Sequence, residues 1–325
     1  MSVLHLCTET PLVRADGVSR WLGRSVWVKR EGMTHPLFGG NKVRKLERLL
    51  GHARSIRATH IITVGAAGSN HCLATALHGR AAGFEVELAL VPQADGAVAR
   101  DNLRGMVATQ ARLHPCAGLA SLGATVAARA LRLRLEGARV YVIPFGGSSA
   151  EGAAGYAGAV DELEAQRKQL KLENFSLHYV ATGSGGTWAG LAAGLSRIAS
   201  PDTLMGARVV AWPGLTRAGL ERLASKTARR LGLGALTVTR GLDDTTLGDG
   251  YGRETEAARE ALARFAEDGV VLDPTYSAKA AAGLVAALRA RPPGSAGLLW
   301  ATRSDVPGPR LEGALPEALA RLLTA

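Results

Sequence analysis

The chain has 325 residues, 47% of them hydrophobic and 40 of them glycine, so it can form two domains with large apolar cores. It carries 39 lysines and arginines against 28 aspartates and glutamates, yet these cations are dispersed along helical stretches and not interleaved with aromatic residues, which argues against a nucleic-acid surface. No uninterrupted apolar run is long enough to cross a membrane.

The cysteines and the N-terminus bear on the cellular compartment. Cys7, Cys72 and Cys116 are odd in number and lack metal-ligand spacing, which predicts free thiols in a reducing cytoplasm and no metal site. Residues 1–14 lack the basic start and apolar stretch of a signal peptide. We expect a small molecule as the partner, and the formal net charge of +11 would attract an anionic one.

Short apolar runs alternate with longer helical patterns along most of the chain. Continuous apolar strands between helices predict an α/β fold, with mainly parallel sheets that helices cover on both faces. No segment of about 20–50 residues recurs, which excludes a solenoid or a propeller. The predicted strands are 60–64, 86–91, 140–143, 177–181, 209–212, 270–272 and 298–301, and the predicted helices include 70–82, 117–135, 152–170 and 257–267.

Two breaks in this pattern divide the chain. The run Pro-Phe-Gly-Gly-Ser-Ser at 144–149 ends the first three strand–helix units, and another boundary falls where the N-terminal segment enters the first long helix. We therefore predict a small inserted domain over 45–147 and a large domain formed by 1–44 and 148–325. A cofactor is expected in the cleft between two such domains.

The most informative block is Phe-Gly-Gly-Asn-Lys-Val-Arg-Lys-Leu-Glu at 38–47. Its two glycines let the backbone pass close to a bound group. Asn41 is predicted as a helix N-cap, which places Lys42 in the first helical turn. The positive end of the helix dipole and burial would both favour the neutral amine that a Schiff base requires. A solvated surface lysine is the alternative that this motif alone leaves open.

A second polar segment, Gly-Ser-Asn-His at 68–71, follows the predicted strand 60–64. Ser69 and Asn70 are natural helix caps, and capping alone is one reading of them. The carboxyl ends of parallel strands are also where ligands gather. There, Asn70 can hydrogen-bond a phenolate oxygen, while Ser69 and His71 can contact a substrate carboxylate or move protons.

A glycine-rich turn follows the predicted strand 177–181 and leads into a helix. Such a turn presents backbone N–H groups and a helix dipole that suit a phosphate. Trp188 stands where a dinucleotide fingerprint has its third glycine, and the acidic residue expected about 20 positions later is missing. A single phosphate fits better than a dinucleotide, and a purely structural turn is the alternative. The residues that would hold the phosphate are Thr182, Gly183, Ser184, Gly185, Gly186 and Thr187.

Two tyrosines lie in later turns. Tyr276 and Ser277 follow the predicted strand 270–272, and Tyr251 sits between two glycines at 250–252. Tyr276 can stack on a flat ring, and Ser277 can reach a ring nitrogen. A capped helix start with a core tyrosine, and a merely flexible turn at 248–252, are the alternatives.

Taken together, these segments resemble the pyridoxal-phosphate-dependent family of 1-aminocyclopropane-1-carboxylate deaminase and D-cysteine desulfhydrase, which has the tryptophan-synthase-β-like fold. The resemblance runs from Thr10 to Lys279, and its strongest blocks keep the family's order: 38–47, 69–70, 144–148, 250–252 and 273–279. One such block can arise by chance, but five in register are specific.

The resemblance implies a role for each candidate residue. Lys42 would form the Schiff base with pyridoxal 5'-phosphate, with Lys45 as its rival, and the turn 182–187 would hold the phosphate. Asn70 would bind the 3′-oxygen of the pyridoxal ring, and Tyr276 would lie against that ring. Ser69 and Tyr251 would face the substrate. Relatives also suggest a homodimer.

Two positions favour the desulfhydrase branch, since the deaminases usually have glutamine where this chain has His71 and glutamate where it has Ser277. A neutral hydroxyl at Ser277 would hold no proton on the ring nitrogen, which favours loss of a β-substituent. The implied activity is an α,β-elimination on a small, D-cysteine-like amino acid that gives pyruvate, ammonia and sulfide.

Ring-opening deamination of 1-aminocyclopropane-1-carboxylate and a non-catalytic pyridoxal-phosphate-binding protein are the alternatives to this elimination. Three segments depart from the family's pattern: Gly68 replaces a usual glutamine, 72–74 is less polar than usual, and 301–305 replaces a His-Thr-Gly-Gly-type loop. Because these segments are expected near the substrate or the ring, the natural amino acid need not be D-cysteine.

Overall fold

The computed structural model of the protein describes residues 4–211 and 215–324. Its strands are β1 (Leu12–Arg14), β2 (Ser25–Arg30), β3 (His60–Ala66), β4 (Glu85–Val91), β5 (Gln93–Ala94), β6 (Arg112–Pro115), β7 (Val140–Ile143), β8 (Leu177–Thr182), β9 (Thr203–Arg208), β10 (Thr239–Asp243), β11 (Ala296–Ala301) and β12 (Leu323–Thr324). Its α-helices are α1 (Asp16–Leu22), α2 (Asn41–Ser55), α3 (Asn70–Ala81), α4 (Ala97–Ala108), α5 (Leu119–Leu135), α6 (Ala150–Gln169), α7 (Gly186–Arg197), α8 (Arg217–Arg230), α9 (Glu256–Glu267), α10 (Ser277–Arg289) and α11 (Glu317–Ala320). Short 3-10 turns lie at Glu31–Met33, Phe145–Gly147 and Thr245–Leu247.

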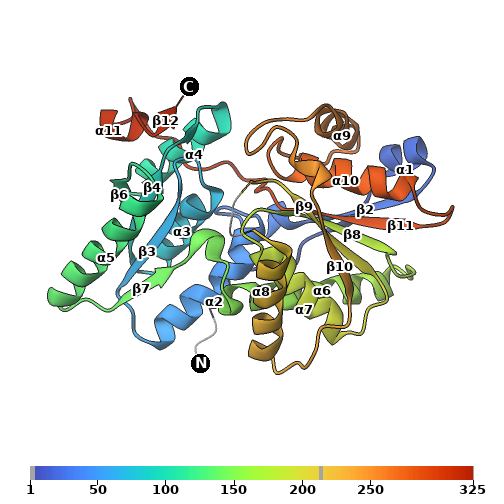
Figure 1. The fold of residues 1–325 in the computed structure, drawn as a ribbon, viewed down its shortest axis with the longest axis horizontal. Coiled ribbons are helices and arrows are strands. Elements are labelled where there is room, and N and C mark those ends of the chain that lie inside the picture. Colours follow the sequence, from blue (N-terminus) through green and yellow to red (C-terminus); the bar gives the residue numbers. More distant parts are fainter. Residues whose placement is uncertain (1–3, 212–214, 325) are drawn as a thin grey trace.

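A six-stranded sheet in the order β1-β2-β11-β8-β9-β10 forms the larger of two units (Figure 1). Its strands pair in parallel, except that β1 runs antiparallel to β2. Helices α6, α7 and α8 cover one face and α1, α9 and α10 cover the other, each over its own apolar cluster. A strand covered on both faces must be apolar on both sides, and β8 is buried at every position.

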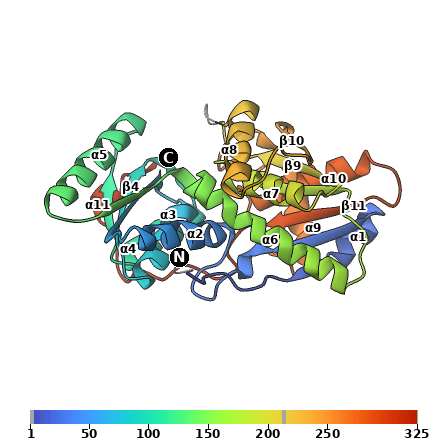
Figure 2. The same ribbon diagram turned by 90° about the horizontal axis from the view of Figure 1, so that it is seen from below.

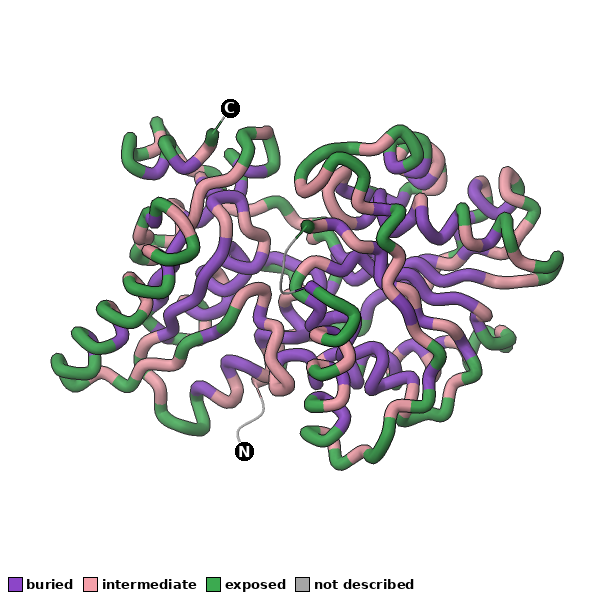
Figure 3. The backbone as a smooth tube through the Cα atoms, viewed as in Figure 1, coloured by how far each residue is buried: buried purple, intermediate pink, exposed green. Residues whose placement is uncertain are grey.

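A four-stranded parallel sheet in the order β6-β4-β3-β7 forms the smaller unit. Helices α2, α3 and α4 pack on one face, and α5 packs on the other. All four strands fall within the predicted small domain, 45–147. Figure 3 shows that the buried backbone follows the sheets of both units, while the outward-facing turns of α5 and α8 are exposed. The α/β fold with mainly parallel sheets is thus confirmed.

The C-terminal segment links the two units. After β11 the chain crosses to the smaller unit, where Leu319 and Leu322 join the apolar cluster under α2, α3 and α4 (Figure 1). Strand β12 then pairs in parallel with β5. The sequence pattern, which assigns 148–325 to the large domain, contains no sign of this crossing because the strand that ends it is only two residues long.

Helices α2 and α6 pack against each other between the units (Figure 2). A side chain at Gly155 of α6 would collide with the carbonyl oxygen of Arg44 on α2, so the glycine permits this close approach. Beside it, Arg44 pairs with Glu31 at 2.6 Å and with Glu162 at 3.0 Å, and the fully buried Lys29 of β2 also pairs with Glu162. Two cations thus meet two carboxylates, and this buried network fixes the start of α2 against the larger sheet.

Two strand predictions are wrong. The predicted strand at 209–212 is displaced, since β9 ends at Arg208 and residues 209–211 continue outside the sheet, while Trp212 lies outside the described residues. The apolar run 270–272 is not a strand either, because it pairs with no strand of the described residues and packs as a loop under α9 and α10. In the described part of the chain, no helix combines the length and the apolar character needed to cross a membrane.

Candidate active site

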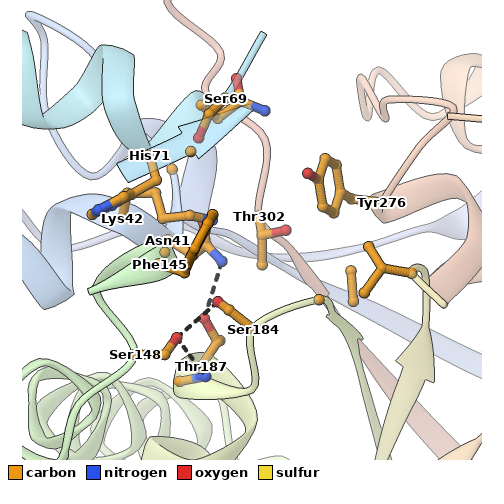
Figure 4. A pocket seen from close by; sticks show the side chains of 18 of the residues that line it. Asn41, Lys42, Ser69, His71, Phe145, Ser148, Ser184, Thr187, Tyr276 and Thr302 are labelled. Atoms are coloured by element: carbon orange, nitrogen blue, oxygen red, sulfur yellow. Dashed lines mark hydrogen bonds between the residues drawn. The ribbon is translucent and has the colours of Figure 1, made fainter. Parts of the chain in front are cut away.

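One cavity of about 620 Å³ gathers most of the predicted site residues. It opens between the two units, and Figure 4 shows Lys42 and Tyr276 on opposite sides of it, with Ser148, Ser184 and Thr187 together at one end. The predicted residues that line it are Lys42, Ser69, Asn70, His71, Gly183, Ser184, Gly185, Gly186, Thr187, Tyr251 and Tyr276. Thr182 and Ser277 do not line it.

Lys42 lies in the first turn of α2, as predicted, but the capping residue differs. Gly40 is the N-cap, with a φ of +92° that favours glycine, and Asn41 is already helical. The Asn41 side chain accepts a hydrogen bond from Lys42 Nζ at 2.8 Å and donates one to Thr187 Oγ1 at 3.0 Å. It thereby connects the amine to the start of α7.

The amine of Lys42 is suited to act as a nucleophile. Removal from water lowers its pKa to about 8, although the carboxylate of Asp273 opposes this shift. The neutral amine is therefore far more populated near physiological pH than for a lysine with an ordinary pKa. A solvated surface lysine, the alternative from the sequence, does not describe this residue.

Lys45, the rival lysine, has a different environment. It is buried one helical turn further on and donates a hydrogen bond to the carbonyl oxygen of Gly146. Burial and the nearby Lys42 hold its pKa well below the usual range. Its amine is thus engaged with the segment that carries Ser148, whereas among the described residues the Lys42 amine bonds only the side-chain oxygen of Asn41.

His71 is buried beside these two lysines. The Thr63 hydroxyl donates to the carbonyl oxygen of Ile143 at 3.0 Å, so it accepts from His71 Nε2 at 2.9 Å. Nδ1 of His71 is then an acceptor, and it has no partner among the described residues. Burial, Lys45 and Lys42 hold the pKa of His71 well below its usual range, so the ring is neutral.

Ser69 and Asn70 begin α3 at the end of β3. Ser69 is the N-cap, as predicted, and its hydroxyl accepts from the N–H of Cys72 at 3.3 Å. The side-chain oxygen of Asn70 accepts from Asn102 at 2.9 Å. The amide nitrogen of Asn70 therefore remains as the donor for a group in the cavity.

The turn between β8 and α7 forms the end of the cavity that suits an anion. Gly185 has a φ of +82°, and a Cβ on Gly186 would collide with Ser148. Ser148 accepts from the N–H of Gly186 at 3.0 Å and shares a 2.7 Å hydrogen bond with Ser184. Hydroxyls and backbone N–H groups thus converge at a helix N-terminus, which is the arrangement that binds phosphate. Thr182 is buried, and its hydroxyl donates to the carbonyl oxygen of Val180.

Ser148 is a site residue that the sequence reasoning missed. It lies in the run 144–149, which was interpreted as a domain boundary and as a block of the family resemblance, with no role given to Ser148. The two glycines before it were the available signal, since glycine-rich turns that follow strands often approach ligands.

The two predicted tyrosines meet. Their hydroxyls are 2.8 Å apart, and the ring of Tyr251 lies edge-on to that of Tyr276, with centroids separated by 5.9 Å. Lys279 of α10 holds the loop of Tyr251 by donating to the carbonyl oxygens of Leu247 and Gly250. Burial raises the pKa of both phenols, so both are proton donors at neutral pH.

Asp273 is a second residue that the sequence reasoning left out of the site. Its carboxylate lines the cavity and accepts from the N–H groups of Thr275, Tyr276 and Ser277, capping α10. The Ser277 hydroxyl donates to the same carboxylate at 2.6 Å and accepts from the Asp273 N–H at 2.7 Å. Ser277 is thus fully buried and engaged with Asp273, and its predicted contact with a ring nitrogen stays a prediction.

Comparisons with known proteins find similar sequences over most of the chain. A family model described as "Pyridoxal-phosphate dependent enzyme" matches residues 3–299. The chain is 35% identical over 280 residues to a protein of Pyrococcus furiosus named "Putative 1-aminocyclopropane-1-carboxylate deaminase", covering 85% of this chain and 84% of that one. It is 36% identical over 282 residues to the "D-cysteine desulfhydrase" of Salmonella paratyphi B, covering 85% of each.

Two solved structures are also similar. A crystal structure described as that of an "ACC deaminase homologue" matches with a TM-score of 0.82 and 32% identity, over 99% of this chain and 96% of that one. A threonine deaminase of Solanum lycopersicum matches with a TM-score of 0.66 and 16% identity, over 94% of this chain and 82% of that one, which shows the fold alone.

Proposed function

The chain belongs to the family of pyridoxal-phosphate-dependent enzymes, and from this we propose that it eliminates the β-substituent of a small, D-cysteine-like amino acid. The products would be pyruvate, ammonia and, from cysteine, sulfide. The observation that carries the proposal is the placement of Lys42, an amine with a pKa of about 8, in the wall of a cavity that ends in an anion-binding turn.

The residues present fit pyridoxal phosphate. The turn at Ser184, Gly185 and Gly186, with Ser148 and Thr187, offers hydroxyl and N–H donors to a phosphate. Lys42 is the amine that would hold the aldehyde, since Lys45 bonds a backbone carbonyl. We assign Asn70 to the ring's phenolate oxygen because its amide nitrogen is left as a donor, and Tyr276 to the side of the ring.

The bound cofactor supplies an electron sink for the charge released at the substrate's Cα. Lys42 is placed to remove the Cα proton, because a neutral amine with a pKa near 8 both accepts and returns a proton readily. The Cβ–X bond then breaks, and its electron pair leaves with X. One water hydrolyses the remaining unsaturated amine to the keto acid and ammonia.

The opposite wall of the cavity can assist departure of the leaving group. Tyr251 and Tyr276 share a hydrogen bond, and their high pKa values keep both phenols protonated. We propose that this pair donates a proton toward the group that leaves Cβ. A Tyr251→Phe change would then slow elimination most for poor leaving groups, whose departure depends on protonation.

Ring-opening deamination of 1-aminocyclopropane-1-carboxylate is the second candidate. The observation that favours it is the relative of that name at 35% identity, together with the fold neighbour at a TM-score of 0.82. Against it, His71 and Ser277 occupy the two positions where such deaminases usually have glutamine and glutamate.

Keto-acid release separates these candidates. Purified holoenzyme is incubated with D- and L-cysteine, D-serine, cysteate, β-chloroalanine and 1-aminocyclopropane-1-carboxylate. Pyruvate from a β-substituted amino acid supports elimination, whereas 2-oxobutyrate from the cyclopropane supports deamination. If cofactor is bound and neither keto acid forms, the chain is a non-catalytic binding protein and the proposal fails.

We also propose a homodimer and a cytoplasmic location, as expected from the sequence. Sedimentation of the holoenzyme and fractionation of the source cells test these two points. A monomer at micromolar concentration, or recovery outside the cytoplasmic fraction, would contradict them.

A further inference from the structure

The rim of the cavity carries a cation that the proposed chemistry does not use. Residues 302–304 directly follow β11, and all three line the cavity. The carbonyl oxygen of Thr302 accepts from the Asn41 N–H at 3.2 Å, and the Ser304 hydroxyl accepts from the Gly39 N–H at 2.9 Å. Arg303 is thus held at both flanks against the two glycines that precede Lys42.

The packing against these glycines is close. A Cβ placed on Gly40 would lie 2.9 Å from the carbonyl oxygen of Thr302 and 3.6 Å from the carbonyl carbon of Arg303. The backbone of Arg303 therefore lies next to the turn that begins α2. Its long side chain starts within the wall of the cavity and is exposed to solvent.

The carboxylates near Arg303 are already paired. Asp305, two residues further on, pairs with Arg30 at 2.8 Å. Asp273, which is the sole acidic side chain among the described residues that line the cavity, accepts from backbone N–H groups and from Ser277. The Arg303 guanidinium makes no hydrogen bond or ion pair with any part of the chain that the structure describes.

The charge of Arg303 is therefore not compensated within the cavity. Burial lowers the pKa of the other two basic side chains that line it, Lys42 and Lys45, and Asp273 is the single carboxylate among the described lining residues. The cofactor's phosphate has its own donors at the start of α7. The substrate's α-carboxylate has the N-terminus of α3, where Ser69 and Asn70 lie and where the helix dipole favours an anion. Arg303 remains without an anion.

We infer that Arg303 selects amino acids whose β-substituent is itself negatively charged, such as a sulfonate, a sulfinate or a phosphate ester. This inference rests on the proposed elimination. A guanidinium offers a planar pair of N–H donors that match two oxygens of such a group. Because the substituent also departs as an anion, the same contact persists after the Cβ–X bond breaks. For cysteate, cleavage of the C–S bond and hydrolysis by one water would give pyruvate, ammonium and hydrogen sulfite.

The test compares charged and neutral substituents in the holoenzyme. Cysteate and O-phosphoserine, each as both enantiomers, are compared with β-chloroalanine by keto-acid release. In the wild type, kcat/KM for the charged compounds should exceed kcat/KM for β-chloroalanine. Arg303→Gln should lower the ratio of the first to the second by about tenfold to hundredfold, mainly through KM. Arg310→Gln, an exposed arginine of the same segment outside the cavity, is the matched control and should leave the ratio unchanged.

Charge reversal sharpens the test. Arg303→Glu should reject cysteate more strongly than Arg303→Gln does, and should raise relative turnover of 2,3-diaminopropionate, whose β-substituent is a cation. High salt should weaken cysteate binding to the wild type and leave β-chloroalanine largely unaffected, because an exposed charge pair is screened. A structural role for Arg303 would produce neither result.

Two outcomes would overturn the inference. If Arg303→Gln lowers kcat/KM for all amino acids by one factor, the residue contacts the α-carboxylate or supports the fold. If it lowers affinity for pyridoxal phosphate instead, the guanidinium serves the cofactor. Failure of this inference can be told apart from failure of the proposed elimination, because calorimetry measures cysteate binding without turnover. Equal affinity of cysteate for the wild-type and Arg303→Gln holoenzymes would also reject the inference.

Discussion

Asn102 fixes the orientation of the Asn70 side chain. Its amide nitrogen donates to the carbonyl oxygen of Gly68 at 2.8 Å and to the side-chain oxygen of Asn70 at 2.9 Å. A backbone carbonyl can only accept, so the Asn102 amide cannot be reversed. Asn70 must therefore turn its oxygen toward Asn102 and its NH₂ group toward the cavity.

Replacing Asn102 by aspartate should reverse this arrangement. A carboxylate accepts from the NH₂ group of Asn70, which turns the Asn70 oxygen toward the phenolate of the bound cofactor. We expect the affinity for pyridoxal phosphate to fall by about tenfold to hundredfold, measured by fluorescence titration of the apoenzyme. Asn102→Ala leaves the Asn70 side chain free to turn. Its affinity for pyridoxal phosphate should therefore fall less than that of Asn102→Asp, although alanine removes more of the side chain. The assignment of Asn70 fails if alanine and aspartate behave alike.

Lys42→Ala should abolish covalent attachment of the cofactor. The purified variant would lack the visible absorption that borohydride bleaches in the wild type, and turnover would fall at least about a thousandfold because the base is also lost. Lys45→Ala is the control, since the Lys45 amine is engaged with Gly146, and it should still give a borohydride-sensitive band. Retention of that band in Lys42→Ala would transfer the role to another lysine.

Attachment of the cofactor should depend on pH through Lys42. Only the neutral amine reacts, and burial lowers its pKa to about 8, so the attachment rate should rise with pH and level off above about 8. The attachment rate at each pH is measured by stopped-flow absorbance after apoenzyme is mixed with pyridoxal phosphate. Asp273 raises the Lys42 pKa, so Asp273→Asn should shift the midpoint to lower pH. A midpoint near the ordinary lysine value of 10.5 would show a solvated amine.

Gly185→Ala should damage both stability and the phosphate site. Gly185 has a φ of +82°, and a methyl group there would collide with Leu220. We expect the free energy of unfolding to fall by about 1–3 kcal/mol and inorganic phosphate to bind more weakly to the apoenzyme. Gly232→Ala is matched, because its φ is +74° with no atom within 4 Å. Gly232→Ala should therefore lose stability through backbone strain but bind phosphate normally. Equal phosphate affinity in Gly185→Ala and Gly232→Ala would argue against the turn as the anion site.

Removing one charge from the buried network of Arg44, Lys29, Glu31 and Glu162 should strongly destabilise the fold. Arg44→Met would leave the buried carboxylate of Glu31 without its cation, while Glu162 keeps Lys29, and we expect a loss of about 3–5 kcal/mol in the free energy of unfolding, measured with urea. Arg48→Met on the same helix removes a partly exposed pair with Glu151 and should cost less than about 1 kcal/mol. Similar losses for both variants would mean that burial of the network is incomplete.

Most of the strands that were predicted correctly are buried on both faces. β3, β4, β8 and β11 are covered by helices of both layers, so their sequences are short apolar runs that can be recognised without the structure. β7, which was also predicted, is an edge strand and is more exposed. β2 was missed because it carries Lys29, which is buried only by virtue of Glu162 on a helix more than a hundred residues away. The run 270–272 was predicted as a strand because it is apolar, but it pairs with no strand of the described residues.

The sequence by itself determined the fold class, because helix starts and apolar strands are local patterns of a few residues. Its resemblance to a known family indicated the cofactor and the segments that we propose to hold it. Only the tertiary structure decided which side chains meet. It brought Ser148 to Ser184, Asn102 to Asn70, and Arg303 to the glycines before Lys42. Such contacts join segments that are distant in the chain. The local sequence around a residue therefore does not show which distant residue becomes its hydrogen-bond partner.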